Sequence, residues 1–175
     1  MKSSEEDLAR ALQFRDEVDW VAMAAHLRGL LEGWPDDATV LCWLSVAERE
    51  LGMDGVAYER FRACLAAEPT DPQILTIAGN GLARFDDPEA ESILRTATLM
   101  HPNLAYARTM YGAYLAREGM SEEALVEIEA AVALAPEDPE TLTEWGVALA
   151  LAGCLDEAVD AFCQACDADP EDGWA

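Results

Sequence analysis

The stretch PETLTEWGVALALAGCLDEAVDAFCQACDADPED, residues 139–172, decides the fold because its pattern recurs along the whole chain. Apolar residues at helical spacing predict one helix before Gly153 and a second helix after it. Glycine favours a turn there because it can adopt the left-handed backbone conformation that ends a helix. The marks of this unit are, in order, Leu142, Trp145, Gly146, Leu149, Gly153, Ala158, Phe162, Ala165 and Pro170.

A proline closes each copy of this pattern, and the copies follow one another at spacings of 34, 33, 34 and 34 residues: Pro35, Pro69, Pro102, Pro136 and Pro170. A fixed period near 34 is typical of helix–turn–helix arrays, in which neighbouring units bury a continuous core. The sequence therefore predicts an all-α fold of about five units and ten helices in a single domain over residues 1–175. The predicted units are 4–37, which is degenerate, 38–71, 72–104, 105–138 and 139–172.

Particular positions of the repeat have physical roles. The eighth position is always small, and this lets the two helices of one unit approach closely: Ser45, Gly79, Gly112 and Gly146. Asp71-Pro72 and Asp138-Pro139 supply an N-cap followed by proline at the first helical position, so each should start a unit. Asp87-Pro88 is expected to do the same inside the third unit, whose turn lacks glycine and is one residue shorter.

Trp145-Gly146 with Leu149, Ala158-x-x-x-Phe162 and Pro170, at 34-residue spacing, closely resemble the tetratricopeptide repeat family. The resemblance covers nearly the whole chain, although the usual tryptophan and leucine slots are exchanged at Leu142 and Trp145. It implies a right-handed superhelix, or α-solenoid, whose concave groove is lined by the first helix of each unit. It also implies a non-catalytic role in holding peptides, helices or partner domains.

The same resemblance implies which side chains line the groove, with Trp43 at its edge: Cys42, Val46, Arg49, Thr76, Asn80, Arg84, Tyr106, Thr109, Arg117 and Thr143. Three arginines on this surface contrast with the acidic chain. Arg84 and Arg117 could clamp a partner carboxylate, and Asn80 could bond an extended backbone. The alternative is that arginines near the end of a helix only complement its dipole.

The charge of the chain is strongly negative. The formal net charge is −24, from 35 acidic and 11 basic residues, and no Lys or Arg follows Arg117. The negative electrostatic potential of such a chain repels phosphate backbones, so no nucleic-acid partner is expected. The acids could keep a helical array soluble and monomeric, or form a face that steers a basic partner. A module that mimics nucleic acid is a further alternative.

Other chemistry is weakly indicated. The Cys163-x-x-Cys166 motif lies in the middle of a predicted helix without a second cysteine pair, so no metal site is expected. Phosphate-binding loops and nucleophile motifs are absent from the sequence, so we expect neither an enzyme nor a cofactor. No apolar run approaches the ~18 residues of a membrane span, and the N-terminus lacks a signal peptide. We therefore expect a cytoplasmic protein without a membrane partner.

The C-terminal helix, predicted from about Leu155 to Ala168, would leave Val159, Phe162 and Cys166 partly uncovered. Trp174 could fold back over them, or this end could self-associate or dock on a partner. The primary functional prediction is a protein–protein interaction adaptor or scaffold that binds a protein or peptide in the groove. The alternatives are an acidic module that sequesters a basic protein, or a structural homo-oligomer joined through its repeat ends.

Overall fold

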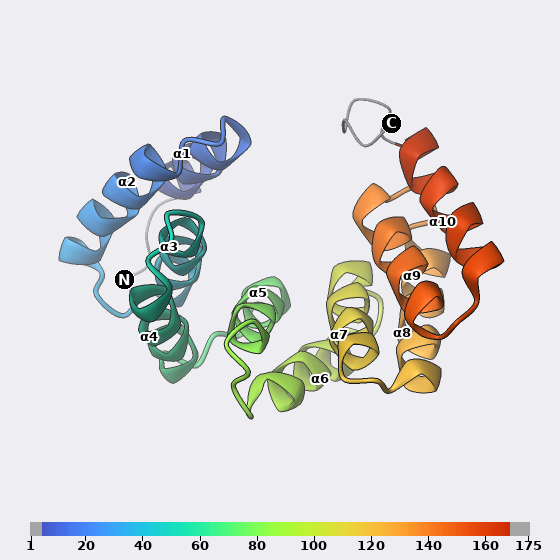
Figure 1. Ribbon diagram of the computed structural model, residues 1–175. Coiled ribbons are helices and arrows are strands. Elements are labelled where there is room, and N and C mark those ends of the chain that lie inside the picture. The colour runs from blue at the N-terminus through green and yellow to red at the C-terminus, as the bar shows by residue number, and fades with distance from the viewer. Residues whose placement is uncertain (1–4, 169–175) are drawn as a thin grey trace. The chain divides into compact units, whose positions relative to one another are not determined.

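The computed structural model describes residues 5–168, and over this range the chain is all-α, with ten helices and no strand. The helices follow one another as five consecutive pairs in a solenoid of helical repeats (Figure 1). Their bounds are α1 Glu5–Asp16, α2 Trp20–Gly33, α3 Ala38–Glu50, α4 Asp54–Ala66, α5 Pro72–Ala83, α6 Ala90–Met100, α7 Ala105–Arg117, α8 Ser121–Leu134, α9 Pro139–Leu151 and α10 Leu155–Ala168. The predicted fold class is confirmed. No helix in this range is long and apolar enough to cross a bilayer.

The chain divides into two compact units, Met1–Asp87 and Pro88–Ala175. Unit 1 holds α1 to α5 and unit 2 holds α6 to α10. The division falls between the two helices of the third repeat, at the Asp87-Pro88 pair in its unusual turn.

In unit 1, α1, α2 and α3 share an apolar cluster: Ala11, Met23, Ala24, Leu27, Val40, Leu44 and Ala47. Helix α3 also packs on α4 and α5. Phe61 of α4 is fully buried, and its ring fills the space that a side chain on Gly81 of α5 would need. The second helix of one repeat is thus packed closely against the first helix of the next.

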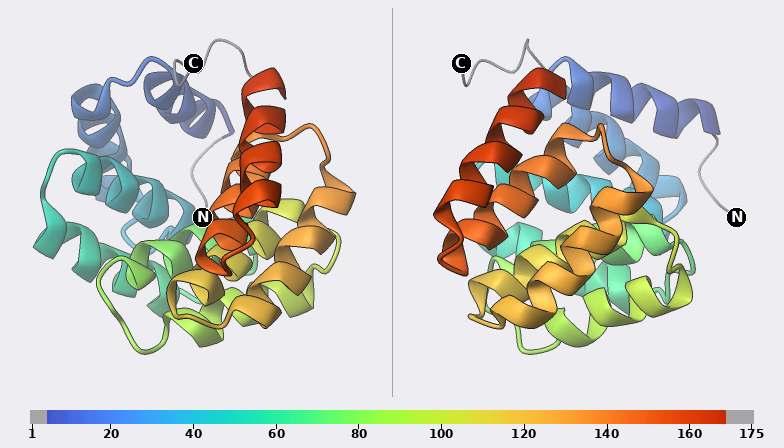
Figure 2. Two further views of the ribbon diagram at one scale, coloured as in Figure 1. Left: turned by 45° about the vertical axis from the view of Figure 1, so that its right-hand side comes forward. Right: turned by 90° about the vertical axis from the view of Figure 1, so that its right-hand side faces the viewer.

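Unit 2 repeats this construction with α7 to α10, drawn from yellow to red in Figure 2. Its two complete repeats each place a large side chain of the second helix against the glycine of the first. Ile128 lies against Gly112, and Phe162 lies against Gly146, where an added Cβ would be 2.6 Å from the ring. The close approach predicted from the eighth position is therefore present in both repeats.

The predicted caps and turns are largely confirmed. Asp71 accepts a hydrogen bond from the backbone N–H of Gln73, and Asp138 accepts one from that of Thr141. The three turn glycines have left-handed φ angles: Gly52 at 74°, Gly119 at 80° and Gly153 at 83°.

The prediction for Asp87-Pro88 is wrong. Helix α6 begins at Ala90 with Glu89 as its N-cap residue, so Pro88 does not occupy the first helical position. Instead, the Asp87 carboxylate is buried and accepts a 2.9 Å hydrogen bond from the hydroxyl of Tyr58 on α4. Asp86 takes the left-handed conformation, with φ at 53°, that glycine takes in the other turns.

Candidate functional site

Two of the residues predicted for the groove in unit 1 are buried. Cys42 is completely buried, and its Sγ lies 3.7 Å from the backbone oxygen of Ile74 on α5. Burial, together with the neighbouring Cys64 thiol, raises the pKa of Cys42 well above its ordinary value. Thr76 is also buried, and its hydroxyl donates to the backbone oxygen of Pro72 at 2.7 Å. Both side chains are covered by the protein itself.

The equivalent position in unit 2 shows why side chains at this position of the repeat can be buried. Thr109 on α7 is buried, and its hydroxyl lies 3.0 Å from that of Thr141 on α9, the first helix of the following repeat. Thr143, at the same position of the last repeat, is exposed and donates to the backbone oxygen of Pro139 at 2.7 Å. At Cys42 and Thr109 the position is thus a packing site between successive first helices.

The other predicted residues of unit 1 stay accessible to different degrees. Trp43 and Val46 are half-buried, and the guanidinium of Arg15 lies 5.3 Å from the Trp43 ring centroid. Arg49 pairs with the adjacent Glu50 at 2.6 Å. Trp43 and Arg49 therefore already have neighbours of their own within unit 1.

Asn80 and Arg84 form the accessible end of α5. Asn80 is half-buried, whereas Arg84 is exposed and is the C-cap residue of the helix. Residues four apart in a helical turn lie on the same side, so the two side chains are neighbours. Within residues 5–168, Arg84 has no ion-pair partner.

In unit 2, Tyr106 is half-buried and Arg117 is exposed at the end of α7. The guanidinium of Arg117 lies 3.8 Å from the Glu144 carboxylate on α9. Arg84 and Arg117 occupy the same slot of the repeat, yet among the described residues an ion pair is present at Arg117 and absent at Arg84.

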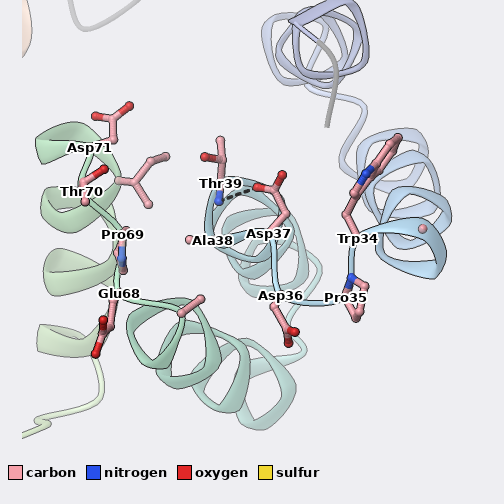
Figure 3. Close-up of a pocket in the computed structure, with 13 residues that line it drawn as sticks. Trp34, Pro35, Asp36, Asp37, Ala38, Thr39, Glu68, Pro69, Thr70 and Asp71 are labelled. Atoms are coloured by element: carbon pink, nitrogen blue, oxygen red, sulfur yellow. Dashed lines mark hydrogen bonds between the residues drawn. The ribbon is translucent and has the colours of Figure 1, made fainter. Parts of the chain in front are cut away.

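A second candidate surface, which the sequence did not reveal, is an acidic pocket of about 550 Å³ in unit 1. Figure 3 shows loop 34–38 and loop 68–71 on opposite sides of it. Four carboxylates line it, from Asp36, Asp37, Glu68 and Asp71, and none of the described lining residues is Lys or Arg.

Two of these carboxylates also cap helices. Asp37 accepts hydrogen bonds from the backbone N–H groups of Thr39 and Val40, and Asp71 accepts one from that of Gln73. Asp36 and Glu68 are exposed. In the sequence, an acid-rich loop stands beside each of the first two repeat prolines. These loops could have indicated an acidic pocket only if their closeness in space had been known.

Within residues 5–168 no group of three or more His, Cys, Asp or Glu side chains is placed to hold a metal ion. Cys163 and Cys166 are exposed on α10. The role suggested for Trp174 lies outside the described residues.

No protein-family model matches this sequence, and a search of curated proteins finds no significant match. Solved structures do match. TTC0263, a thermophilic TPR protein of Thermus thermophilus, is 24% identical, with a TM-score of 0.81 over 97% of this chain and 93% of its own. PilW, a type IV pilus biogenesis factor, is 21% identical, with a TM-score of 0.79 over 95% of this chain and 79% of its own.

A third match, YrrB, is described as a TPR protein with an unusual peptide-binding site. It is 22% identical, with a TM-score of 0.63 over 97% of this chain and 88% of its own. At these identities the likeness concerns the fold.

Proposed function

We propose that this chain, which has the fold of tetratricopeptide-repeat proteins, is a non-catalytic interaction module that binds a peptide or helix of another protein through its first helices. The likeness to YrrB, which has a peptide-binding site, supports a role of this kind. The observation that carries the proposal is Arg84, an exposed cation on a first helix of a chain whose net charge is −24.

Arg84 is suited to bind a single carboxylate of the partner. Its planar guanidinium offers donors in a fork that matches a carboxylate, and within residues 5–168 no acidic side chain already occupies them. Asn80, on the same side of α5, supplies an amide that can bond the backbone of an extended peptide. A strongly acidic ligand would be repelled by the chain as a whole, so we infer a ligand with an isolated carboxylate.

Arg117 would serve unit 2 in the same way. Its pairing with Glu144 spans 3.8 Å between two partly exposed side chains. Exposed ion pairs are worth roughly 0–1 kcal/mol, so a partner carboxylate could displace Glu144 at little cost. Thr143, exposed on the neighbouring first helix, adds a hydroxyl for hydrogen bonding.

The second candidate function is the capture of a basic protein by acidic surface. The pocket between loops 34–38 and 68–71 favours it, because four carboxylates line a cavity large enough for an arginine or lysine side chain. Such binding would weaken steeply with salt, since exposed charges are screened beyond ~10 Å at about 0.1 M ionic strength.

A selection of peptides from a random displayed library distinguishes the two candidate functions. Peptides that bind the wild type are titrated against R84E, R117E and the control R95E, which makes the same charge change on exposed Arg95 of α6. The first proposal expects peptides with one carboxylate, whose affinity falls at least tenfold in R84E or R117E and is unchanged in R95E.

Equal losses in all three variants would indicate a general charge effect and would contradict the first proposal. Selection of Lys- and Arg-rich peptides, bound more tightly by R84E and released by salt, would favour the acidic surface. A sedimentation mass above 19.0 kDa without any peptide would point to homo-oligomers.

A further inference from the structure

Helix α10 has an outward apolar stripe that stays exposed within the described residues 5–168. Its small residues Ala158, Ala161 and Ala165 are buried, and α10 packs on α9 (Figure 1). Leu155 and Val159 are 65% and 60% exposed, and Phe162 is 36% exposed. Cys163 and Cys166 are exposed too, and they continue the same line along the helix.

The spacing places these residues in one sector of the helix. With about 100° of rotation per residue, the stripe from Leu155 to Cys166 spans a sector about 100° wide, beside the buried alanines. On its other flank lie four exposed carboxylates, from Asp156, Glu157, Asp160 and Asp167. The helix thus has three faces in order: one packed on α9, one apolar and exposed, and one acidic.

We propose that this stripe is a docking surface for a basic amphipathic helix of a partner protein. The stripe runs along about 16 Å of α10, which matches about three turns of a second helix laid beside it. Leucine or valine side chains of the partner would cover Leu155, Val159 and the exposed edge of Phe162. Lysine or arginine residues flanking that apolar face would lie next to the α10 carboxylates.

Charge complementarity selects this occupant over a second copy of the chain. No Lys or Arg follows Arg117 in the sequence, so α10 of a second copy would bring the same carboxylates and no compensating cation. Like charges brought together at an interface oppose association, whereas a basic helix removes that repulsion. The proposed surface lies on a second helix and is independent of Arg84 and Arg117.

The alkylation rate of the two exposed cysteines of the stripe reports directly whether a peptide covers it. The probe is a synthetic helical peptide with leucines on one face and lysines on its flanks, and the control is a scrambled peptide of the same composition. Alkylation of Cys163 and Cys166 by iodoacetamide is followed by mass spectrometry. We expect the amphipathic peptide at saturation to slow alkylation at least tenfold, and the scrambled peptide to have little effect.

Variants then locate the contact. L155Q/V159Q, at two exposed positions, should weaken peptide binding at least tenfold. V126Q is the matched control, because Val126 on α8 is 66% exposed and lies outside the stripe. R84E should leave the protection unchanged, so the outcome is independent of the proposed function. Circular dichroism checks that each variant is folded.

Four results would overturn the proposal. Equal protection by the scrambled peptide, or equal loss in V126Q, would mean that charge alone attracts the peptide. A dimer in sedimentation that L155Q/V159Q dissociates would make a second copy the occupant. Protection that occurs only after removal of residues 169–175 would make the chain's own segment the occupant.

Discussion

The carboxylate of Glu48, which is completely buried, accepts a 2.6 Å hydrogen bond from the Nε of Arg60. Arg28 contacts the same carboxylate at 2.9 Å, so the group joins α2, α3 and α4. The three following repeats carry a leucine in this slot: Leu82, Leu115 and Leu149. The second repeat thus has a buried anion between two partly exposed cations where the following repeats have an apolar contact.

Replacing Glu48 by glutamine should lower the free energy of unfolding by about 1–3 kcal/mol. Glutamine keeps the shape but removes the charge that offsets two guanidinium groups, and hydrogen bonds to charged groups contribute roughly 1.5–3 kcal/mol. Arg28 and Arg60 are partly exposed and regain water, which limits the loss. Urea unfolding followed by circular dichroism measures the change.

E50Q is the matched control on the same helix, because Glu50 is exposed and pairs with the adjacent Arg49 at the surface. It should change the free energy of unfolding by less than about 0.5 kcal/mol. E48L, which restores the residue type of the other repeats, should be more stable than E48Q. An E48Q protein as stable as the wild type would show that the buried pair contributes nothing.

Adding a methyl group at Gly112 should be more harmful than at Gly146. A Cβ at Gly112 would collide with Ile128, which is completely buried, and would lie 3.0 Å from the backbone oxygen of Ala124. At Gly146 the neighbour is Phe162, which is 36% exposed and can turn towards solvent. Overpacking typically destabilises by about 1–3 kcal/mol, and we expect G112A in that range and G146A below it.

The control for this comparison is G29A. Gly29 lies inside α2 with nothing within 4 Å of an added Cβ, so alanine should stabilise the helix by about 0.5–1 kcal/mol. Thermal unfolding of the three variants gives the order of their stabilities. Equal effects of G112A and G146A would mean that Phe162 is held as rigidly as Ile128.

Local chemistry explains why much of the fold could be predicted. Asp71 and Asp138 cap the helices that follow them, and Gly153 supplies a backbone conformation that few other residues adopt. These effects act within a few residues of chain, so the sequence displays them directly. At 34-residue spacing, they define the repeat before any tertiary contact is known.

The candidate site was less predictable because exposure depends on the next repeat. Nothing in the residue types distinguishes Thr109, which α9 buries, from Thr143, which stays exposed. The sequence predicts that Asp87 caps a helix. In the structure its carboxylate instead accepts a hydrogen bond from Tyr58 and pairs with Arg62, both more than twenty residues earlier in the chain. Such outcomes are set by contacts between helices, and a local pattern does not contain them.

The hydrogen bond from Tyr58 to Asp87 predicts a pH effect. It is the main cause that raises the pKa of Tyr58 above the ordinary value of a phenol, with smaller contributions from burial and from the Asp87 charge. An acid whose pKa is raised by folding contributes stability below its unfolded pKa of ~10 and loses that contribution as pH rises through the folded value. Unit 1 should therefore lose stability at alkaline pH.

The pKa itself can be read from tyrosinate absorbance, with Y58F used to subtract the other tyrosines. In D87N a neutral amide oxygen, a weaker acceptor, replaces the carboxylate that holds the phenol proton, so the pKa of Tyr58 should move down towards its ordinary value. An unchanged midpoint in D87N would show that Asp87 does not control the phenol. Unfolding in urea at neutral and alkaline pH should show a smaller pH dependence for Y58F than for the wild type.

Replacing Thr109 by valine should destabilise unit 2, whereas the same change at Thr143 should not. The Thr109 hydroxyl lies 3.0 Å from that of Thr141 and donates to the backbone oxygen of Ala105 at 3.1 Å, in a buried setting. A buried hydrogen bond typically contributes about 0.5–1.5 kcal/mol, and valine removes the hydroxyl while it keeps the size. T143V removes an exposed hydroxyl that water replaces, so its unfolding midpoint in urea should match the wild type. If T109V and T143V behaved alike, the burial of this repeat position by the following first helix would have no energetic consequence, and Thr109 would return as a candidate for contact with a partner.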